Sequence, residues 1–174
     1  EAFPLGNGIL GALVWGDGAP LTISLDRTDL WDLRPVPEYY SEDYSYTRMR
    51  QWEREGRYEE LKALYDDPYH RPAPTKIPAG RIEVSFPETR AFQEGHLDLR
   101  NGLAEMRFAG EVRVRVWIHA ELAVGVIEVE GAPDAALRLN APDFAGTAND
   151  QRSTGFVMGE LSQLGYPPPL ESAG

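Results

Sequence analysis

Acidic residues gather in one short stretch of the chain, and paired carboxylates are the groups that can perform acid–base chemistry on a sugar. They are Asp26, Asp29, Asp32, Glu38, Glu42 and Asp43. Hydrolysis of a glycosidic bond needs two carboxyl groups facing each other across the bond. A spacing of three residues on an extended segment does not by itself direct two carboxylates to one point. We therefore expect these acids to cap turns and to solvate the surface, and we assign no catalytic residue.

Aromatic residues follow the same stretch. Trp31 and the tyrosines at positions 39, 40, 44 and 46 lie on a segment predicted to be a loop. Pyranose rings pack on aromatic faces, but aromatic side chains also build cores and interfaces. A glycan contact and a domain interface therefore both stay open for this loop. The candidate substrate-binding residues are Trp31, Asp32, Tyr39 and Tyr40, whereas Trp15 and Trp52 are expected in the core.

Gly6, Gly8 and Gly11 match the pattern G-x-G-x-x-G, which in dinucleotide-binding proteins approaches a pyrophosphate. Such a site needs a buried strand before the glycines and a helix directly after them. Here Pro4 precedes the glycines, and glycine and proline interrupt the chain again at positions 16 to 20. A phosphate-binding glycine hairpin would need a lysine on the next strand, and the first lysine is Lys62. We predict no cofactor.

Metal sites and several classes of partner are disfavoured by composition. The histidines at positions 70, 96 and 119 are too scattered for a sequence-local metal site, and cysteine is absent, so we predict no metal. The net charge of −11 argues against binding to nucleic acid. No apolar run approaches the ~18 residues of a membrane span. A cysteine-free chain tolerates an oxidising compartment, so we expect an extracellular or periplasmic location, with the cytoplasm left open.

The elements that must position these residues are mostly strands. Residues 112–120 alternate, with Val112, Val114 and Val116 on one side and charged or aromatic residues on the other. Similar alternation around them predicts five consecutive antiparallel strands over residues 96–141. Asn101-Gly102 is expected to form a two-residue type I′ turn between two of them. Such a meander must cover its apolar face with another layer, which predicts a sandwich.

The first third of the chain supplies part of that other layer, with strands expected near residues 8–15, 21–25 and 80–86. Residues 47–66 show a helical spacing of apolar side chains interrupted at Gly56, which predicts one kinked helix or two short ones, ended by Asp66-Asp67-Pro68. Residues 68–78 and 145–174 are expected to be loops. The fold class is thus mainly β, an antiparallel sandwich with a short helical insertion, in a single domain at residues 1–174.

Two segments carry a resemblance to a known family. The first reads PLGNGILGALVWG at residues 4–16, and the second reads ISLDRTDLWD at residues 23–32. Together they resemble the opening of glycoside hydrolase family 95, the α-L-fucosidase-like family, and more distantly that of family 65. LDLRNGLAEMRF at residues 97–108 and LGYP at residues 164–167 are similar to later segments of the same family.

This resemblance implies an antiparallel β super-sandwich of the galactose-mutarotase-like type at the N-terminus of a larger enzyme. In that family an (α/α)6 barrel supplies the catalytic carboxyl groups, so residues 1–174 would be an incomplete sandwich without the barrel. Ile9 stands where the family usually has arginine, and residues 26–29 also depart from its usual sequence. A fucosidase specificity is therefore not carried over.

The implied function is that of a non-catalytic domain, inactive alone, that supports the barrel and shapes the substrate entrance of a fucosidase- or galactosidase-like enzyme. Its partners would be a glycan, through the parent enzyme, and the catalytic barrel in cis. A stand-alone carbohydrate-binding or adhesive sandwich is the alternative. A structural interaction module without any sugar contact is a third reading.

Overall fold

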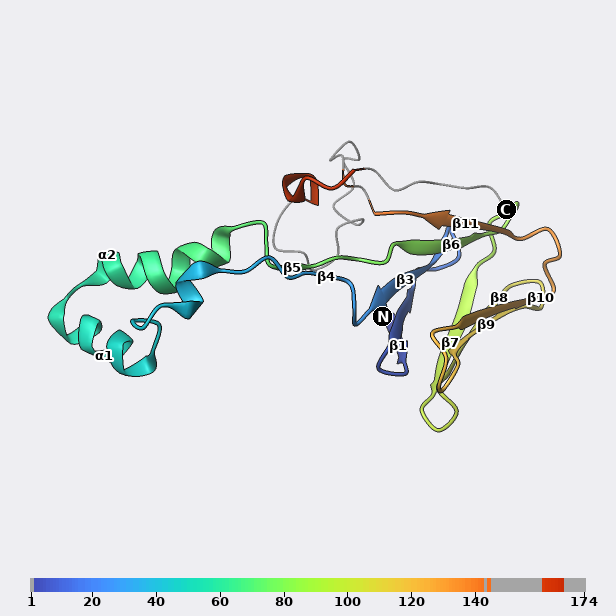
Figure 1. The fold of residues 1–174 in the computed structure, drawn as a ribbon. Helices are drawn as coiled ribbons and strands as arrows, with labels where there is room; N and C mark the ends of the chain where they lie inside the picture. The colour runs from blue at the N-terminus through green and yellow to red at the C-terminus, as the bar shows by residue number, and fades with distance from the viewer. Residues whose placement is uncertain (1, 143, 145–160, 168–174) are drawn as a thin grey trace.

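The computed structural model describes residues 2–142, 144 and 161–167, and it shows two antiparallel sheets packed face to face with a helical arm extending away from them (Figure 1). The five-stranded sheet, in spatial order, contains β1 (Ala2–Gly6), β2 (Leu10–Trp15), β3 (Leu21–Arg27), β6 (Arg81–Ser85) and β11 (Ala136–Asn140). The four-stranded sheet, in spatial order, contains β10 (Gly125–Glu130), β9 (Val112–Ile118), β8 (Leu103–Phe108) and β7 (Phe92–Asp98). The predicted mainly β sandwich is confirmed.

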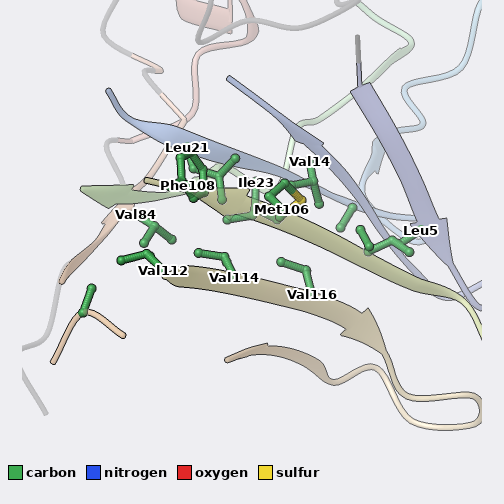
Figure 2. Packing of buried hydrophobic residues seen from close by; sticks show 13 residues of the cluster. Leu5, Val14, Leu21, Ile23, Val84, Met106, Phe108, Val112, Val114 and Val116 are labelled. Carbon is green, nitrogen blue, oxygen red and sulfur yellow. The ribbon is translucent and has the colours of Figure 1, made fainter. Parts of the chain in front are cut away.

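The core lies between the two sheets, as Figure 2 shows. In β9 the predicted alternation is confirmed, because Val112, Val114 and Val116 are each at most 1% exposed. They pack in one cluster with apolar residues of β1, β2, β3, β6 and β8, among them Leu5, Val14, Leu21, Ile23, Val84, Met106 and Phe108. Each strand contributes every second side chain, which is the pattern a two-layer core requires.

The five strands predicted over residues 96–141 are all present, as β7 to β11, but β11 joins the five-stranded sheet, so the prediction that they form one meander is wrong. After β10 the chain turns at Gly131, whose φ is +77°. A Cβ at this glycine would lie only 2.5 Å from the carbonyl oxygen of Glu111, so the crossing is tight. β11 then pairs antiparallel with β6, with Leu137 opposite Val84. Alternation is the same in either sheet and therefore does not choose the partner strand.

The two-residue turn predicted at Asn101-Gly102 is also wrong. Asp98 pairs with Leu103, which leaves a four-residue loop, and of the Asn-Gly pair only Gly102 has a positive φ, +60°. The carboxylate of Asp98 accepts hydrogen bonds from the backbone N–H groups of Arg100 (2.9 Å) and Asn101 (3.2 Å). These bonds stabilise the wider loop, as aspartate side chains commonly do in turns.

The helical insertion forms the arm. It contains α1 (Tyr46–Glu55), α2 (Tyr58–Leu61), a π-helical turn (Lys62–Asp66) and a 3₁₀ turn (Asp67–His70). The hydroxyl of Ser45 caps α1 by accepting from the N–H of Arg48 at 3.2 Å, and Gly56 ends the helix with a φ of +72°. The break at Gly56 is confirmed. The helical path passes Asp66-Asp67 and ends at His70, because Pro68 sits in the first turn of the 3₁₀ segment, where its missing N–H costs nothing.

The two tryptophans expected in the core differ in location and in how far they are buried. Trp52 is 7% exposed inside the arm, with the guanidinium carbon of Arg57 4.7 Å from its ring centre. Trp15 is only partly buried, since its neighbour Val14 takes the core-facing position of β2 and Trp15 points to the opposite face. Its indole N–H donates to the hydroxyl of Ser24 at 3.0 Å. The core assignment of Trp15 is therefore wrong.

Candidate functional site

The corner that carries Trp31 lies where the chain leaves the sandwich after β3. There β4 (Trp31–Asp32) pairs antiparallel with β5 (Thr75–Lys76), a short strand inside the stretch expected to be a loop. The N–H of Thr28 donates to the carbonyl of Ile9 at 3.1 Å and joins the corner to the β1–β2 turn. Trp31 is left 48% exposed, as a stacking residue must be.

Asp32, the next residue, is buried and fully engaged within the protein. It is 2% exposed, and one carboxylate oxygen accepts the backbone N–H of Arg34 at 3.1 Å. The other oxygen accepts the hydroxyl of Tyr166 at 3.0 Å and lies 3.1 Å from the guanidinium of Arg34. The same guanidinium lies 5.7 Å from the Tyr166 ring centre and donates to the carbonyl of Leu164. Asp32 thus fastens residues 161–167 to the corner.

Residues 161–164 were expected to lie in a loop, and this is wrong. They form a 3₁₀ helix (Leu161–Leu164) in which Leu161 is 1% and Leu164 is 3% exposed. Leucines three residues apart share one face of a 3₁₀ helix, so both can be buried together. The remaining residues of the predicted loop at 145–160 and 168–174 lie outside the described residues. The LGYP segment therefore serves to dock the C-terminal part of the chain on the corner.

A group of four tyrosines holds the loop after the corner. The ring centres of Tyr39 and Tyr44 are 4.7 Å apart, those of Tyr44 and Tyr65 are 5.1 Å apart, and those of Tyr39 and Tyr69 are 6.4 Å apart. Desolvation in this group, followed by the neighbouring Tyr69, raises the pKa of the Tyr39 and Tyr44 hydroxyls. Tyr40, in the same 3₁₀ turn (Pro37–Tyr40), is 80% exposed. Among the described residues no ring pair joins Trp31 or Tyr40 to another aromatic ring.

An ion pair between Glu38 and Arg71 closes this loop, and it predicts a pH dependence. The two terminal nitrogens of the Arg71 guanidinium donate to the carboxylate, Nη1 at 2.9 Å, and these hydrogen bonds lower the pKa of Glu38. The stabilisation is present above the unfolded-state pKa of about 4.3 and is lost as the pH falls through the lower folded-state value. We expect E38Q to be less stable than the unsubstituted chain at pH 6, and we expect the difference to shrink as the pH falls below about 4.3. Urea unfolding across this range measures the difference, and a gap that does not change with pH would contradict the assignment.

The glycine motif forms a β-hairpin. β1, a strand not expected from the sequence, pairs with β2 from Ala2 opposite Trp15 to Gly6 opposite Gly11, and β2 continues through Ala12 without opening a helix. The dinucleotide reading needs a helix at that position and is therefore excluded by the local structure.

Asn7 occupies the turn of this hairpin and joins the two sheets. Its side-chain oxygen accepts the N–H groups of Ile9 and Leu10, both at 2.9 Å. Its amide nitrogen donates to the carbonyls of His119 (2.7 Å) and Leu122 (2.9 Å), in the loop that follows β9. One side chain thus stabilises its own turn and fixes the opposite sheet at the same end of the sandwich.

Asn7→Ala is expected to lower the free energy of unfolding by about 2 kcal/mol, because four partly exposed hydrogen bonds are lost at about 0.5–1 kcal/mol each. Chemical denaturation measures this change. Asn101→Ala is the matched control, since its amide only donates to the neighbouring Asp98, and it should cost less than about 1 kcal/mol. Equal effects of the two substitutions would show that the link between the sheets contributes nothing.

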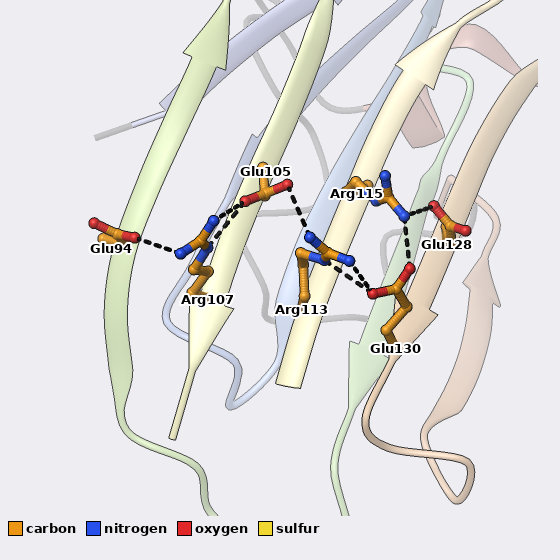
Figure 3. A network of polar contacts seen from close by, with 7 residues as sticks. All are labelled: Glu94, Glu105, Arg107, Arg113, Arg115, Glu128 and Glu130. Atoms are coloured by element: carbon orange, nitrogen blue, oxygen red, sulfur yellow. Dashed lines mark hydrogen bonds and ion pairs between the residues drawn. The ribbon is translucent and has the colours of Figure 1, made fainter. Parts of the chain in front are cut away.

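The outer face of the four-stranded sheet carries a chain of ion pairs rather than free arginines (Figure 3). Its members are Glu94, Glu105, Arg107, Arg113, Arg115, Glu128 and Glu130. Arg115, for example, lies 2.9 Å from Glu128 and 2.6 Å from Glu130. Hydrogen bonding, chiefly from Arg113, lowers the pKa of Glu130. Four carboxylates facing three guanidinium groups leave no surplus positive charge for an anionic ligand.

Three of the four remaining acids of the candidate stretch are also paired, whereas Glu42 is exposed and forms no ion pair with any residue that the structure describes. Asp26 pairs with Lys76, Asp29 lies 2.7 Å from Arg27, and Asp43 lies 2.7 Å from Arg48. In the part of the chain that the structure describes, no group of three or more His, Asp or Glu side chains could hold a metal ion. No helix among the described residues is long and apolar enough to cross a membrane. The paired carboxylates hold turns and loops in place.

Comparison with known protein families adds the identity of the domain. The chain matches the family described as Glycosyl hydrolase family 65, N-terminal domain, over residues 1–131. No curated protein matches it. The matched residues include the glycine hairpin, the Trp31 corner, the arm and all of the four-stranded sheet. The chain therefore belongs to the family of glycosyl hydrolase family 65 N-terminal domains.

Proposed function

We propose that this chain is the non-catalytic β-sandwich of a glycoside hydrolase with fucosidase- or galactosidase-like specificity, of the family 95 type. It supports an (α/α)6 catalytic barrel in cis and shapes one wall of the substrate entrance, in an extracellular or periplasmic enzyme. The family match over residues 1–131 carries the proposal. Five of the six candidate acids are paired within the domain, which favours a non-catalytic role, since paired carboxylates are poor acids and bases for chemistry on a bound sugar.

The substrate contact is assigned to the corner and the loop after it. Trp31 is 48% and Tyr40 is 80% exposed, and aromatic side chains of this kind can stack on a sugar. Tyr39 holds the loop through the tyrosine group, and Asp32 holds the corner through Arg34 and Tyr166. The side chains of Trp31 and Tyr40 each stand on a braced segment, so in this proposal each loses little conformational entropy when a glycan binds.

The core-facing side of the five-stranded sheet supports continuation of the sandwich by further polypeptide. Leu21, Val84 and Leu137 are cross-strand neighbours in one row, yet Leu21 and Val84 are 0% exposed and Leu137 is 56% exposed. Leu139, next along the same face of β11, is 69% exposed. The four-stranded sheet therefore covers β6 but not β11. Apolar side chains in a core-facing row are normally covered, so we propose that the parent protein covers them.

Replacing both leucines, L137E/L139E, is expected to change the free energy of unfolding of this chain by less than about 0.5 kcal/mol, as for surface positions. In the product of the complete reading frame the same pair should cost about 4 kcal/mol or more, because two charges are then buried without partners. Thermal unfolding of both proteins measures the difference. L33E, at a leucine that is 78% exposed, should be neutral in both. Equal, small effects in the longer protein would mean that β11 stays in water.

The function itself is tested by glycosidase assays of the same two proteins. The product of the complete reading frame should hydrolyse aryl fucosides or galactosides, and residues 1–174 alone should not. Trp31→Ala and Tyr40→Ala should each raise KM about 5-fold, the loss of about 1 kcal/mol of stacking. Tyr58→Ala, at an exposed tyrosine of α2, is the matched control and should leave KM unchanged. Glycan binding by residues 1–174, without hydrolysis by any longer product, would favour a stand-alone carbohydrate-binding module.

A further inference from the structure

The arm is electrically neutral on a strongly acidic chain. Residues 46–71 contain six basic and six acidic side chains, whereas the whole chain has a formal charge of −11. Two copies of this chain carry the same net charge and therefore repel each other as they approach. The arm, which extends away from the sandwich (Figure 1), is where two copies can meet without that repulsion.

The exposed face of α1 is basic and concave. Tyr46, Arg50 and Arg54 lie four residues apart and so share one face of the helix. Together with Thr47, Gln51 and Glu55 they line an open depression of about 560 Å³. Arg50 has only a long contact, 3.7 Å, with Glu53. Arg54 makes no ion pair with any residue that the structure describes.

The exposed face of the second helical segment is acidic. Glu59, Ala63 and Asp66 follow one another at spacings of four and three residues across α2 and the π-helical turn, and all three are exposed. Neither Glu59 nor Asp66 forms an ion pair within the described ranges. Ala63 between them is small enough to let another helix approach closely. The two faces of the arm thus carry exposed charges of opposite sign, four residues apart on α1 (Arg50 and Arg54) and seven residues apart on the second segment (Glu59 and Asp66).

The arm also has little core of its own. In α1 and α2 only Trp52 is buried, while Tyr46 is 72% and Tyr58 is 65% exposed. Short helices gain most of their stability from packing against a partner rather than from intrinsic propensity. Tyrosine and arginine, the residues that this surface presents, are enriched at the centres of protein interfaces. A partner helix with acidic side chains would fit the depression on α1.

We propose that the arm is the interface for a second copy of this chain. In the two-fold arrangement, Arg50 and Arg54 of α1 in one copy lie against Glu59 and Asp66 in the other copy, and the reverse contact forms at the same time. A two-fold interface requires such a self-complementary surface, and the arm supplies both halves of it. Tyr46 packs at the edge of the contact, where the depression on α1 begins.

Sedimentation velocity of the unsubstituted chain (residues 1–174) and of two charge-reversal variants tests the proposal. The unsubstituted chain should form a dimer as its concentration rises. R50E/R54E and E59R/D66R should each raise the dimer dissociation constant at least about 10-fold, because each places like charges against each other. An equimolar mixture of the two variants should recover a dimer, since the reversed charges again face opposite ones. This recovery separates a specific contact from loss of folding.

R100E/R138E provides the matched control, because these arginines are exposed and lie on the sandwich, outside the arm. It should dimerise like the unsubstituted chain. The proposal would be overturned if the unsubstituted chain remained monomeric at about 100 μM, or if the mixture of the two variants stayed monomeric. So would a dimer that R50E/R54E leaves unchanged. The glycosidase assays above do not depend on any of these results.

Discussion

Phe108→Ala is expected to lower the free energy of unfolding by about 3–5 kcal/mol, the largest effect of any single substitution considered for this domain. Phe108 is 1% exposed at the end of β8, between the two sheets. Its ring lies edge-on to Phe86 (5.2 Å between ring centres) and to Phe92 (5.7 Å). A Cβ at Gly18 would be 2.7 Å from the Phe108 ring, so backbone and ring are in close contact on a further side.

The expected cost follows from this packing. Removing the ring deletes buried apolar surface and two aromatic contacts, and the rigid strands around it collapse only partly into the space. Equilibrium denaturation by urea measures the loss. Leu99→Ala is the matched control, because Leu99 is 85% exposed in the β7–β8 loop, and it should change stability by less than about 0.5 kcal/mol. A cost below about 1 kcal/mol for Phe108→Ala would mean that the two sheets are not packed as described.

Asp32→Ala is expected to lower the free energy of unfolding by about 2–3 kcal/mol and to release residues 161–167 from the corner. The substitution removes the acceptor for the Tyr166 hydroxyl and for the backbone N–H and guanidinium of Arg34, and each lost contact costs about 0.5–1.5 kcal/mol. Arg34 is half-exposed and can turn to water, which keeps the cost below that of a fully buried pair. Denaturation measures the stability, and limited proteolysis within residues 161–167 measures the release.

Tyr166→Phe is the matched control for Asp32→Ala, because it removes a single hydrogen bond and keeps the ring beside Arg34. It should cost about 1 kcal/mol and leave the segment docked. The same pair of variants separates two roles for Asp32. If Asp32→Ala keeps full stability and protease resistance while the parent enzyme loses affinity for its glycan, Asp32 is a substrate contact and not the anchor of this segment.

The strands of the second half of the chain were predictable from the sequence because their pattern is local. In β9 the alternation of Val112, Val114 and Val116 with charged residues holds in any fold that buries one face of a sheet. The break of the arm at Gly56 is equally local, since glycine readily takes the positive φ that ends a helix. The length of the hairpin loop at residues 99–102 was predicted wrongly, although it is also a local feature. The carboxylate of Asp98 stabilises a loop of four residues rather than two.

From the sequence, the candidate site could be predicted as a stretch of residues, but the burial and contacts of its side chains could not. Trp31 and Tyr40 are indeed exposed, as expected of a loop that could meet a glycan or another domain. The burial of Asp32 was not foreseeable, because its partner Tyr166 is 134 residues away in the chain. Only one part of the role of Asn7 could be predicted from the sequence, since an asparagine between two glycines indicates a turn. Its hydrogen bonds to His119 and Leu122 depend on how the two sheets pack.

The sequence by itself determined the secondary structure of this protein in outline: strands of period two, a broken helical insertion, and a glycine segment that cannot open a helix. Only the tertiary structure decided which sheet receives β11, which leaves Leu137 exposed, and how residues 161–167 dock on Asp32. The physical reason is that periodicity reports which face of a strand is apolar, whereas the choice of partner depends on the packing of residues far apart in the chain.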